Sequence, residues 1–120
     1  MTNTILVVED NELNLKLFCD LLAAHGYAPH GLRDGREALE TARRISPRLI
    51  IMDIQLPHIT GHELIRAMRA DPELAAIPII AVTAFAMSGD EEQIRGEGAQ
   101  DYVTKPISVA RFIETVQRHV

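Results

Sequence analysis

The chain has 120 residues, a formal net charge of -5, 47% hydrophobic residues and 24% charged residues. This length predicts a single domain over residues 1–120, and the composition excludes disordered and fibrous classes. The single cysteine excludes an intrachain disulfide and favours a reducing, cytoplasmic setting. The apolar runs are too short to insert into a membrane, and the acidic balance argues against a nucleic-acid partner.

The first half of the chain alternates strand and helix patterns. A β-branched run over residues 4–8 predicts a strand that is covered on both faces. Residues 11–25 have a helical period, with Leu13 and Leu17 on the apolar face. Residues 27–32 predict a second, weaker strand. The first half therefore begins with a strand, a helix and a strand.

A second helix and a third strand follow. Asp34 and Glu37 have the spacing of a capping box, which predicts the start of a helix that ends before Pro47. Residues 49–52 predict a buried strand that ends at Asp53.

The same alternation continues in the second half. Thr60 caps a further helix, whose Arg66 and Arg69 we interpret as a solvated face near acidic residues. Residues 79–82 predict the fourth strand and residues 101–104 the fifth. The remaining helices are expected after Ser88 and Ser108.

Strands that alternate with helices indicate an α/β fold with a parallel sheet covered on both faces. We expect a doubly wound, flavodoxin-like sheet of five strands in the order 2-1-3-4-5, flanked by five helices.

Polar or small groups follow the carboxyl ends of four predicted strands, where ligands bind in sheets of this kind. These residues are Glu9, Asp10, Asp53, Thr83, Ala84 and Lys105. Each pair of carboxylates at about 4 Å repels by roughly 4 kcal/mol at an effective dielectric near 20. Protonation of one carboxyl or binding of a divalent cation relieves this repulsion, and a set of oxygen ligands favours Mg²⁺.

A carboxylate beside a metal ion can act as a nucleophile towards phosphorus and form an aspartyl phosphate. Asp53 is the candidate for this role. Lys105 would neutralise a phosphoryl oxygen, the hydroxyl of Thr83 would donate to another, and the small Ala84 would leave access. Taken singly, these residues also fit ordinary roles as helix caps, turn residues, strand residues or loop charges.

The residues at these strand ends resemble the receiver domain of bacterial two-component response regulators, the CheY-like fold, over essentially all 120 residues. They are most similar to the single-domain receivers of alphaproteobacterial cell-cycle signalling. The motifs are Val8-Glu9-Asp10-Asn11, Met52-Asp53-Ile54-Gln55-Leu56-Pro57 with Gly61, Val82-Thr83-Ala84, and Tyr102-Val103-Thr104-Lys105-Pro106.

The resemblance implies that Asp53 accepts a phosphoryl group from a phosphohistidine of a partner. It implies a Mg²⁺ ion held by Glu9, Asp10, Asp53 and the backbone carbonyl of Gln55. The phosphoryl group would contact Thr83, Ala84 and Lys105, and the Lys105–Pro106 bond would be cis. Thr83 and Tyr102 would form a coupled switch.

The resemblance also implies the partners. They are a sensor histidine kinase or phosphatase, or a histidine phosphotransfer protein, together with a downstream protein effector. With no output domain expected, a monomer would signal by protein contact, in cell-cycle or cell-fate control, through a surface near Phe85, Met87, Tyr102 and Val103. The protein would not be a classical enzyme, since it would catalyse only its own phosphotransfer and dephosphorylation. Its partner kinases would recruit it to a cell pole.

Three other functions remain open at this point. A flavodoxin-like flavin carrier is disfavoured by the acidic residues after the first strand. A Mg²⁺-dependent phosphatase would want a second carboxyl where the amide Gln55 stands. A pseudo-receiver that is never phosphorylated is disfavoured by the intact acidic residues and Lys105.

Overall fold

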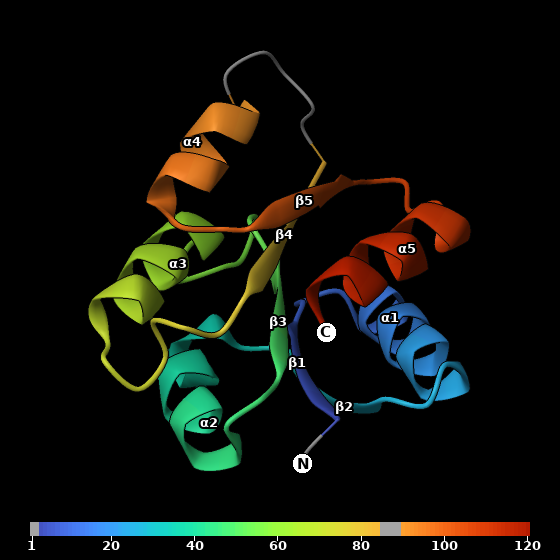
Figure 1. Cartoon of the computed structure of the whole chain (residues 1–120). Helices are drawn as coiled ribbons and strands as arrows, with labels where there is room; N and C mark the ends of the chain where they lie inside the picture. Colours follow the sequence, from blue (N-terminus) through green and yellow to red (C-terminus); the bar gives the residue numbers. More distant parts are fainter. Residues whose placement is uncertain (1–2, 85–89) are drawn as a thin grey trace.

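The computed structural model describes residues 3–84 and 90–120. Within these residues, a parallel sheet has the predicted order β2-β1-β3-β4-β5 (Figure 1). Its strands are β1 (Thr4–Val8), β2 (Ala28–Leu32), β3 (Leu49–Asp53), β4 (Ile79–Thr83) and β5 (Asp101–Thr104). The helices are α1 (Glu12–Ala24), α2 (Ala38–Ile45), α3 (Gly61–Ala70), α4 (Asp90–Glu97) and α5 (Val109–His119), with a short 3-10 turn η1 (Gly35–Glu37). The predicted fold class is confirmed.

Helices cover both faces of the sheet, so its central strands are buried. Helices α1 and α5 lie on one face, and α2, α3 and α4 lie on the other (Figure 1). All residues of β3 and β4 are buried. On the α1 and α5 side, the rings of Phe18 and Phe112 pack with centroids 5.0 Å apart. The sheet is therefore a rigid platform between two apolar layers.

Strands β3 and β4 end at Asp53 and Thr83, the polar residues with which the apolar runs over residues 49–52 and 79–82 are expected to end. Asp53 is in register with Val82, and Thr83 is in register with Thr104. These polar residues remain in the ladder because their backbone groups pair while their side chains stand at the sheet edge. Both side chains are consequently held by strand geometry rather than by a loop.

Two expectations about helix packing are wrong in detail. Leu13 and Leu17, expected on the apolar face of α1, are 78% and 39% exposed. The carboxylate of Asp34 accepts from the backbone N–H of Arg36, but it starts η1, and α2 begins only at Ala38. The predicted cap at Thr60 is confirmed, since its side chain accepts from Glu63 N. Ser88 lies outside the described residues.

Candidate functional site

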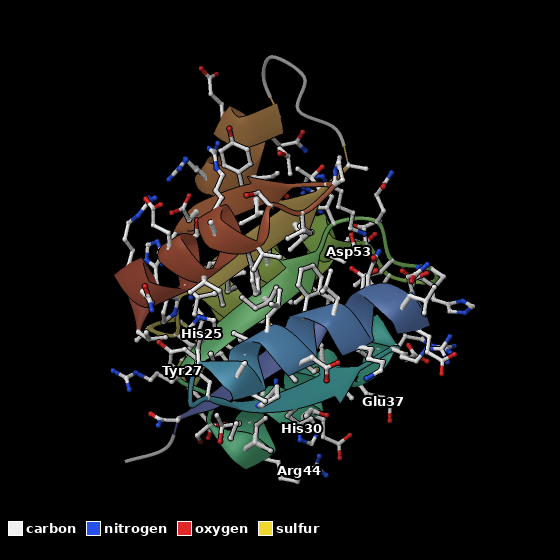
Figure 2. All side chains as sticks on the ribbon, turned by 90° about the vertical axis from the view of Figure 1, so that its right-hand side faces the viewer. His25, Tyr27, His30, Glu37, Arg44 and Asp53 are labelled. Carbon is white, nitrogen blue, oxygen red and sulfur yellow. The ribbon has the colours of Figure 1, made fainter. Side chains whose placement is uncertain are left out.

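The carboxyl edge of the sheet gathers charged side chains from three strands that are far apart in sequence. Glu9 and Asp10 follow β1, Asp53 ends β3 and Lys105 follows β5. Figure 2 shows Asp53 at the edge towards which the strands point, opposite the edge near His25 and Tyr27. The parallel direction of β1, β3 and β5 is the cause of this meeting.

The three carboxylates lie close enough to share one ligand. Glu9, Asp10 and Asp53 each offer an oxygen, and these oxygens lie within 4.8 Å of one another. Glu9 and Asp53 are 1% and 2% exposed, while Asp10 is half-buried and faces the opening. Hard cations such as Mg²⁺ bind oxygen donors in this arrangement and keep some of their waters.

Lys105 reaches both buried carboxylates. Its Nζ lies 3.3 Å from Oδ2 of Asp53 and 3.2 Å from Oε2 of Glu9. Among the described residues, no donor makes a well-aligned hydrogen bond to Oε2 of Glu9. One ammonium therefore contacts two of the three carboxylates, which leaves the cluster short of positive charge.

The pKa values of Glu9 and Lys105 are both raised in this cluster. The pKa of Glu9 is raised to about 7, first because burial removes hydration from the carboxylate and second because Asp53 repels its charge. Burial disfavours the charged form of Lys105, but the charges of Asp53 and Glu9 outweigh it and raise its pKa. Lys105 is thus held in its charged form, and the carboxylates favour an added cation.

The carboxylate of Asp53 is oriented by the loop that follows it. The backbone N–H of Gln55 donates to Oδ1 of Asp53 at 3.0 Å, while Lys105 approaches Oδ2. Gly61, at the start of α3, donates to the carbonyl of Ile54 at 2.9 Å. A Cβ at residue 61 would lie 2.4 Å from the carbonyl oxygen of Asp53, so only glycine permits this close approach.

The other predicted site residues lie on the neighbouring strands. Thr83 is buried at the end of β4, and Ala84 after it is exposed. Tyr102 is half-buried on β5, with the guanidinium of Arg95 5.8 Å above its ring. The cis bond between Lys105 and Pro106 is confirmed.

The expected partner surface needs one correction. Val103 is 2% exposed and packs into the core on the α1 and α5 side. Side chains alternate along β5, so Tyr102 and Val103 cannot both face the same side. Phe85 and Met87 lie outside the described residues.

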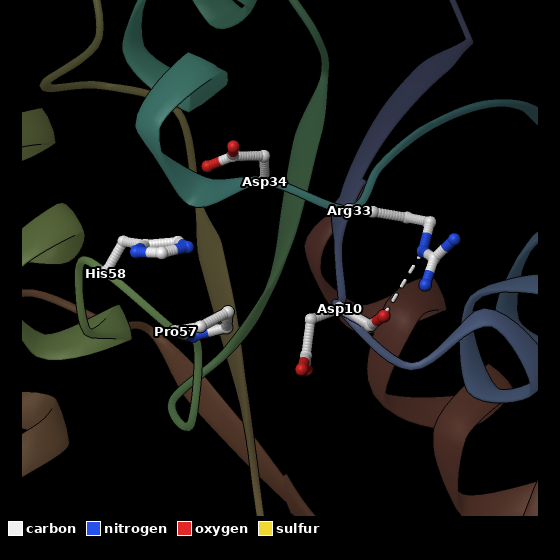
Figure 3. Close-up of a pocket in the computed structure, with 5 residues that line it drawn as sticks. All are labelled: Asp10, Arg33, Asp34, Pro57 and His58. Carbon is white, nitrogen blue, oxygen red and sulfur yellow. Dashed lines mark hydrogen bonds between the residues drawn. The ribbon is translucent and has the colours of Figure 1, made fainter.

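A hollow of about 310 Å³ adjoins the cluster at Asp10. Its lining residues are Asp10, Arg33, Asp34, Pro57 and His58 (Figure 3). The Nε of Arg33 donates to the carbonyl of Asp10 at 3.2 Å, and its guanidinium points away from His58 (Figure 3). His58 has a φ of 70°, an uncommon value for a residue with a side chain. The hollow leaves the Asp10 side of the cluster accessible.

Three exposed apolar side chains form a group near the same edge that was not expected from the sequence. Leu13 and Leu17 lie in the first turns of α1, and Val109, 48% exposed, begins α5. Helices α1 and α5 lie side by side (Figure 1), and both start at the carboxyl edge. The helical period shows which residues share a face, but it does not show how much of that face other elements cover. The exposure of these side chains could therefore not be predicted from the sequence.

Within residues 3–84 and 90–120, the helices are too short or too polar to cross a membrane. The arrangement at the sheet edge offers a buried, oriented carboxylate, two further carboxylates and a charged lysine. Such a group can bind a divalent cation and present Asp53 as a nucleophile to an incoming phosphoryl group.

Comparison with known proteins gives consistent matches over the whole chain. Residues 5–117 match the family described as "Response regulator receiver domain". The chain is 55% identical to the polar-differentiation response regulator DivK of Brucella ovis over 120 residues, which cover 100% of this chain and 98% of that protein. The same identity and coverage hold for DivK of Brucella suis.

Solved structures agree with the sequence matches. The chemotaxis response regulator CheY4 of Vibrio cholerae has a TM-score of 0.93 at 27% identity, with 100% of both chains covered. The receiver domain of a sensor histidine kinase from Pseudomonas aeruginosa has a TM-score of 0.89 at 35% identity, covering 99% of this chain and 98% of that one. That crystal structure holds a magnesium ion coordinated in the active site cleft.

Proposed function

Because this chain belongs to the response regulator receiver domain family, we propose that it is a phosphorylation-dependent switch whose acceptor is the carboxylate of Asp53. The observation that carries the proposal is the position of this carboxylate. It is 2% exposed, its two oxygens have different partners in Gln55 and Lys105, and it borders Glu9 and Asp10.

The proposed reaction is the transfer of one phosphoryl group from a phosphohistidine of a partner protein. An oxygen of Asp53 attacks phosphorus, the phosphorus–nitrogen bond of the donor breaks, and the imidazole leaves with the electron pair of that bond. The product is an acyl phosphate on Asp53. Attack by water on the same phosphorus would return the free carboxylate and inorganic phosphate, so the protein would catalyse only its own phosphorylation and dephosphorylation.

Glu9, Asp10, Asp53 and the backbone carbonyl of Gln55 would hold Mg²⁺. Their oxygen chemistry, their mutual closeness and the raised pKa of Glu9 all fit a divalent cation. Bound there, Mg²⁺ supplies positive charge against the carboxylates and phosphoryl oxygens. The domain from Pseudomonas aeruginosa, which has the same fold, holds such an ion in its cleft.

Lys105, Thr83 and Ala84 would receive the phosphoryl group. Lys105 already contacts Oδ2 of Asp53, so a short movement brings its ammonium to a phosphoryl oxygen. The hydroxyl of Thr83, at the end of the adjacent strand, would donate to another oxygen, and the small Ala84 would leave room. When a dianionic phosphoryl group forms on Asp53, the movement of Lys105 and Thr83 towards it would rearrange this edge of the sheet.

Thr83 and Tyr102 would pass this rearrangement to the surface. When Thr83 moves towards the phosphoryl group, the half-buried ring of Tyr102 would turn inward and change the surface formed by α4, β5 and α5. Tyr102 would contribute to an effector-binding surface there, together with Phe85 and Met87. Output of a single receiver domain, acting as a monomer, would then occur through protein contact.

The phosphodonor would dock on the exposed apolar group beside the site. A donor must reach Asp53 from the carboxyl edge, and Leu13, Leu17 and Val109 present apolar surface near that edge. Such surface favours a protein partner. A sensor histidine kinase or phosphatase, or a histidine phosphotransfer protein, is the donor we propose.

The names of the relatives suggest the cellular process in which this chain takes part. Two of them are named polar-differentiation response regulators, and 55% identity over the full chain supports a related role here. We therefore assign the protein to cell-cycle or cell-fate control in the cytoplasm, with recruitment to a cell pole by its partner kinases.

Intact-mass measurement with acetyl phosphate and Mg²⁺ tests the acceptor. The wild-type chain should gain one phosphoryl group, and Asp53→Asn should gain none. Asp20→Asn is the matched control, because Asp20 is exposed on α1 and paired with Lys16, and it should be labelled like wild type. Absence of label on the wild type, beside a receiver that is labelled, would refute the proposal.

A pull-down that compares wild type with Asp53→Asn addresses the partners. Proteins retained only by the phosphorylated wild-type chain are effector candidates. A set of retained proteins that is identical for both chains would contradict a phosphorylation-dependent output.

A further inference from the structure

One face of α3 carries three cationic or ionisable side chains that reach the carboxyl end of α4. His62, Arg66 and Arg69 follow each other at spacings of four and three residues, which places them on one side of the helix. Nδ1 of His62 lies 2.5 Å from Oε1 of Glu97, and Nη1 of Arg66 lies 3.4 Å from Oε2 of Glu97. Arg69 Nε donates to the carbonyl of Gly98 at 2.8 Å.

The position of Glu97 is unfavourable without these contacts. Glu97 is the last residue of α4, where the helix dipole places negative partial charge, and its side chain is only 10% exposed. A largely buried carboxylate at this end needs hydrogen-bonding or cationic partners, and His62 and Arg66 supply them from another helix. The attachment of this end of α4 therefore depends on α3.

The loop after α4 is fitted closely to the same face. Gly98 has a φ of 121°, which favours glycine, and a Cβ there would lie 2.3 Å from Cγ of Arg69. Arg69 also donates to the carbonyls of Ala75 and Ile77, both at 2.7 Å. The bridge from Glu97 to His62 and Arg66 thus sits beside a fixed anchor at Arg69.

Helix α4 in turn contacts the residue that we propose as the switch. The guanidinium of Arg95 lies over the ring of Tyr102 and pairs with Asp101 at 3.2 Å. Ile94 is buried in the apolar cluster against which Tyr102 packs. A change in how α4 is held therefore changes the surroundings of Tyr102.

We propose that the bridge from Glu97 to His62 and Arg66 restrains α4 in its resting position and so sets how readily phosphorylation at Asp53 alters the surface around Tyr102. This inference rests on the proposed function of Asp53 and adds positioning residues outside that site. An interaction that stabilises the resting arrangement shifts the conformational equilibrium away from the switched arrangement. By thermodynamic linkage, it weakens binding at the phosphorylation site by the same factor.

Beryllium fluoride, a stable analogue of the phosphoryl group, tests the inference when titrated in the presence of Mg²⁺. The chain has two tyrosines and no tryptophan, so Tyr102 is the remaining intrinsic fluorophore in a Tyr27→Phe background. In this background, Glu97→Gln and His62→Gln should each bind beryllium fluoride about two- to fivefold more tightly, the range expected for a partly exposed ion pair. The double variant should show no further increase beyond Glu97→Gln, because both substitutions remove one shared bridge.

Glu92→Gln is the matched control, since Glu92 is exposed on the same helix, and its affinity should equal that of the parent. Unchanged or weaker binding by Glu97→Gln and His62→Gln, or additive effects in the double variant, would overturn the bridge. His62→Gln keeps the test open if Glu97→Gln does not fold. Failure of the parent chain to bind beryllium fluoride would instead overturn the role of Asp53.

Discussion

Replacing Gly61 by alanine tests how closely α3 must approach the proposed acceptor. An added Cβ would lie 2.4 Å from the carbonyl oxygen of Asp53 and 2.6 Å from Cα of Ile54. Both atoms belong to backbone that cannot easily move, because Ile54 N donates to the carbonyl of Val82 at 2.9 Å. The φ of Gly61 is not positive, so the clash alone opposes alanine.

The expected magnitude follows from two opposing terms. Overpacking at a fixed site costs about 1–3 kcal/mol. Loss of conformational freedom in the unfolded chain returns about 0.4–1 kcal/mol. Gly61→Ala should therefore lower the free energy of unfolding by about 1.3 kcal/mol, the difference between the midpoints of these two ranges, and the displaced Asp53 should be phosphorylated more slowly.

Urea unfolding followed by circular dichroism measures the stability, and intact mass measures the phosphorylation rate. Gly96→Ala is the control, since Gly96 lies exposed in α4 with no atom within 4 Å of an added Cβ. It should be stabilised by about 0.5 kcal/mol because alanine is the better helix former. If Gly61→Ala were as stable as wild type, or behaved like Gly96→Ala, the close-approach argument would be refuted.

Three further substitutions test separate features. His58→Asn should raise the free energy of unfolding by about 0.5–1 kcal/mol, because asparagine tolerates the left-handed backbone at φ 70° better; an unchanged urea midpoint would contradict this. Asp101 pairs with Arg118 and His119, and although burial opposes its charge, the hydrogen bond from His119 helps to lower its pKa. When the pKa of a carboxyl is lower in the folded than in the unfolded protein, its negative charge stabilises the fold at pH values above the ordinary aspartate range. This stabilisation is lost as the pH falls through the folded-state pKa. Asp101→Asn should thus cost about 1–2 kcal/mol at neutral pH and less at about pH 3; equal losses in urea unfolding at both pH values would count against the pairing. Lys105→Ala should keep Mg²⁺ binding, measured by calorimetry, yet lose phosphorylation-dependent partner binding, and retained partner binding would exclude the role of Lys105.

The site could be predicted because the common direction of the strands determines which residues meet at the sheet edge. Each of β1, β3 and β4 is an apolar run that stops at a polar residue, and parallel strands align these stops at one edge. Glu9, Asp53 and Lys105 are 96 residues apart at most, yet the topology alone brings them together. Nothing about the packing of individual side chains was needed for this step.

Contacts between helices could not be predicted in the same way. The sequence predicts Arg66 and Arg69 on a solvated face, but Arg69 makes hydrogen bonds to Gly98 and to the loop after α3. The pattern within α3 shows which residues share a side, not which distant element covers that side. His62 and Glu97 are 35 positions apart in the sequence, with β4 between them, so their contact depends on the packed positions of α3 and α4.

The electrostatics of the site depend partly on what the sequence predicts and partly on the packing that only the structure gives. Sequence predicts that three carboxylates repel one another, but repulsion alone does not decide which of them gains proton affinity. At Glu9, which is 1% exposed, burial is the larger cause and the charge of Asp53 the next. The pKa of Glu9 therefore rises to about 7, so a proton competes with a cation for this carboxylate.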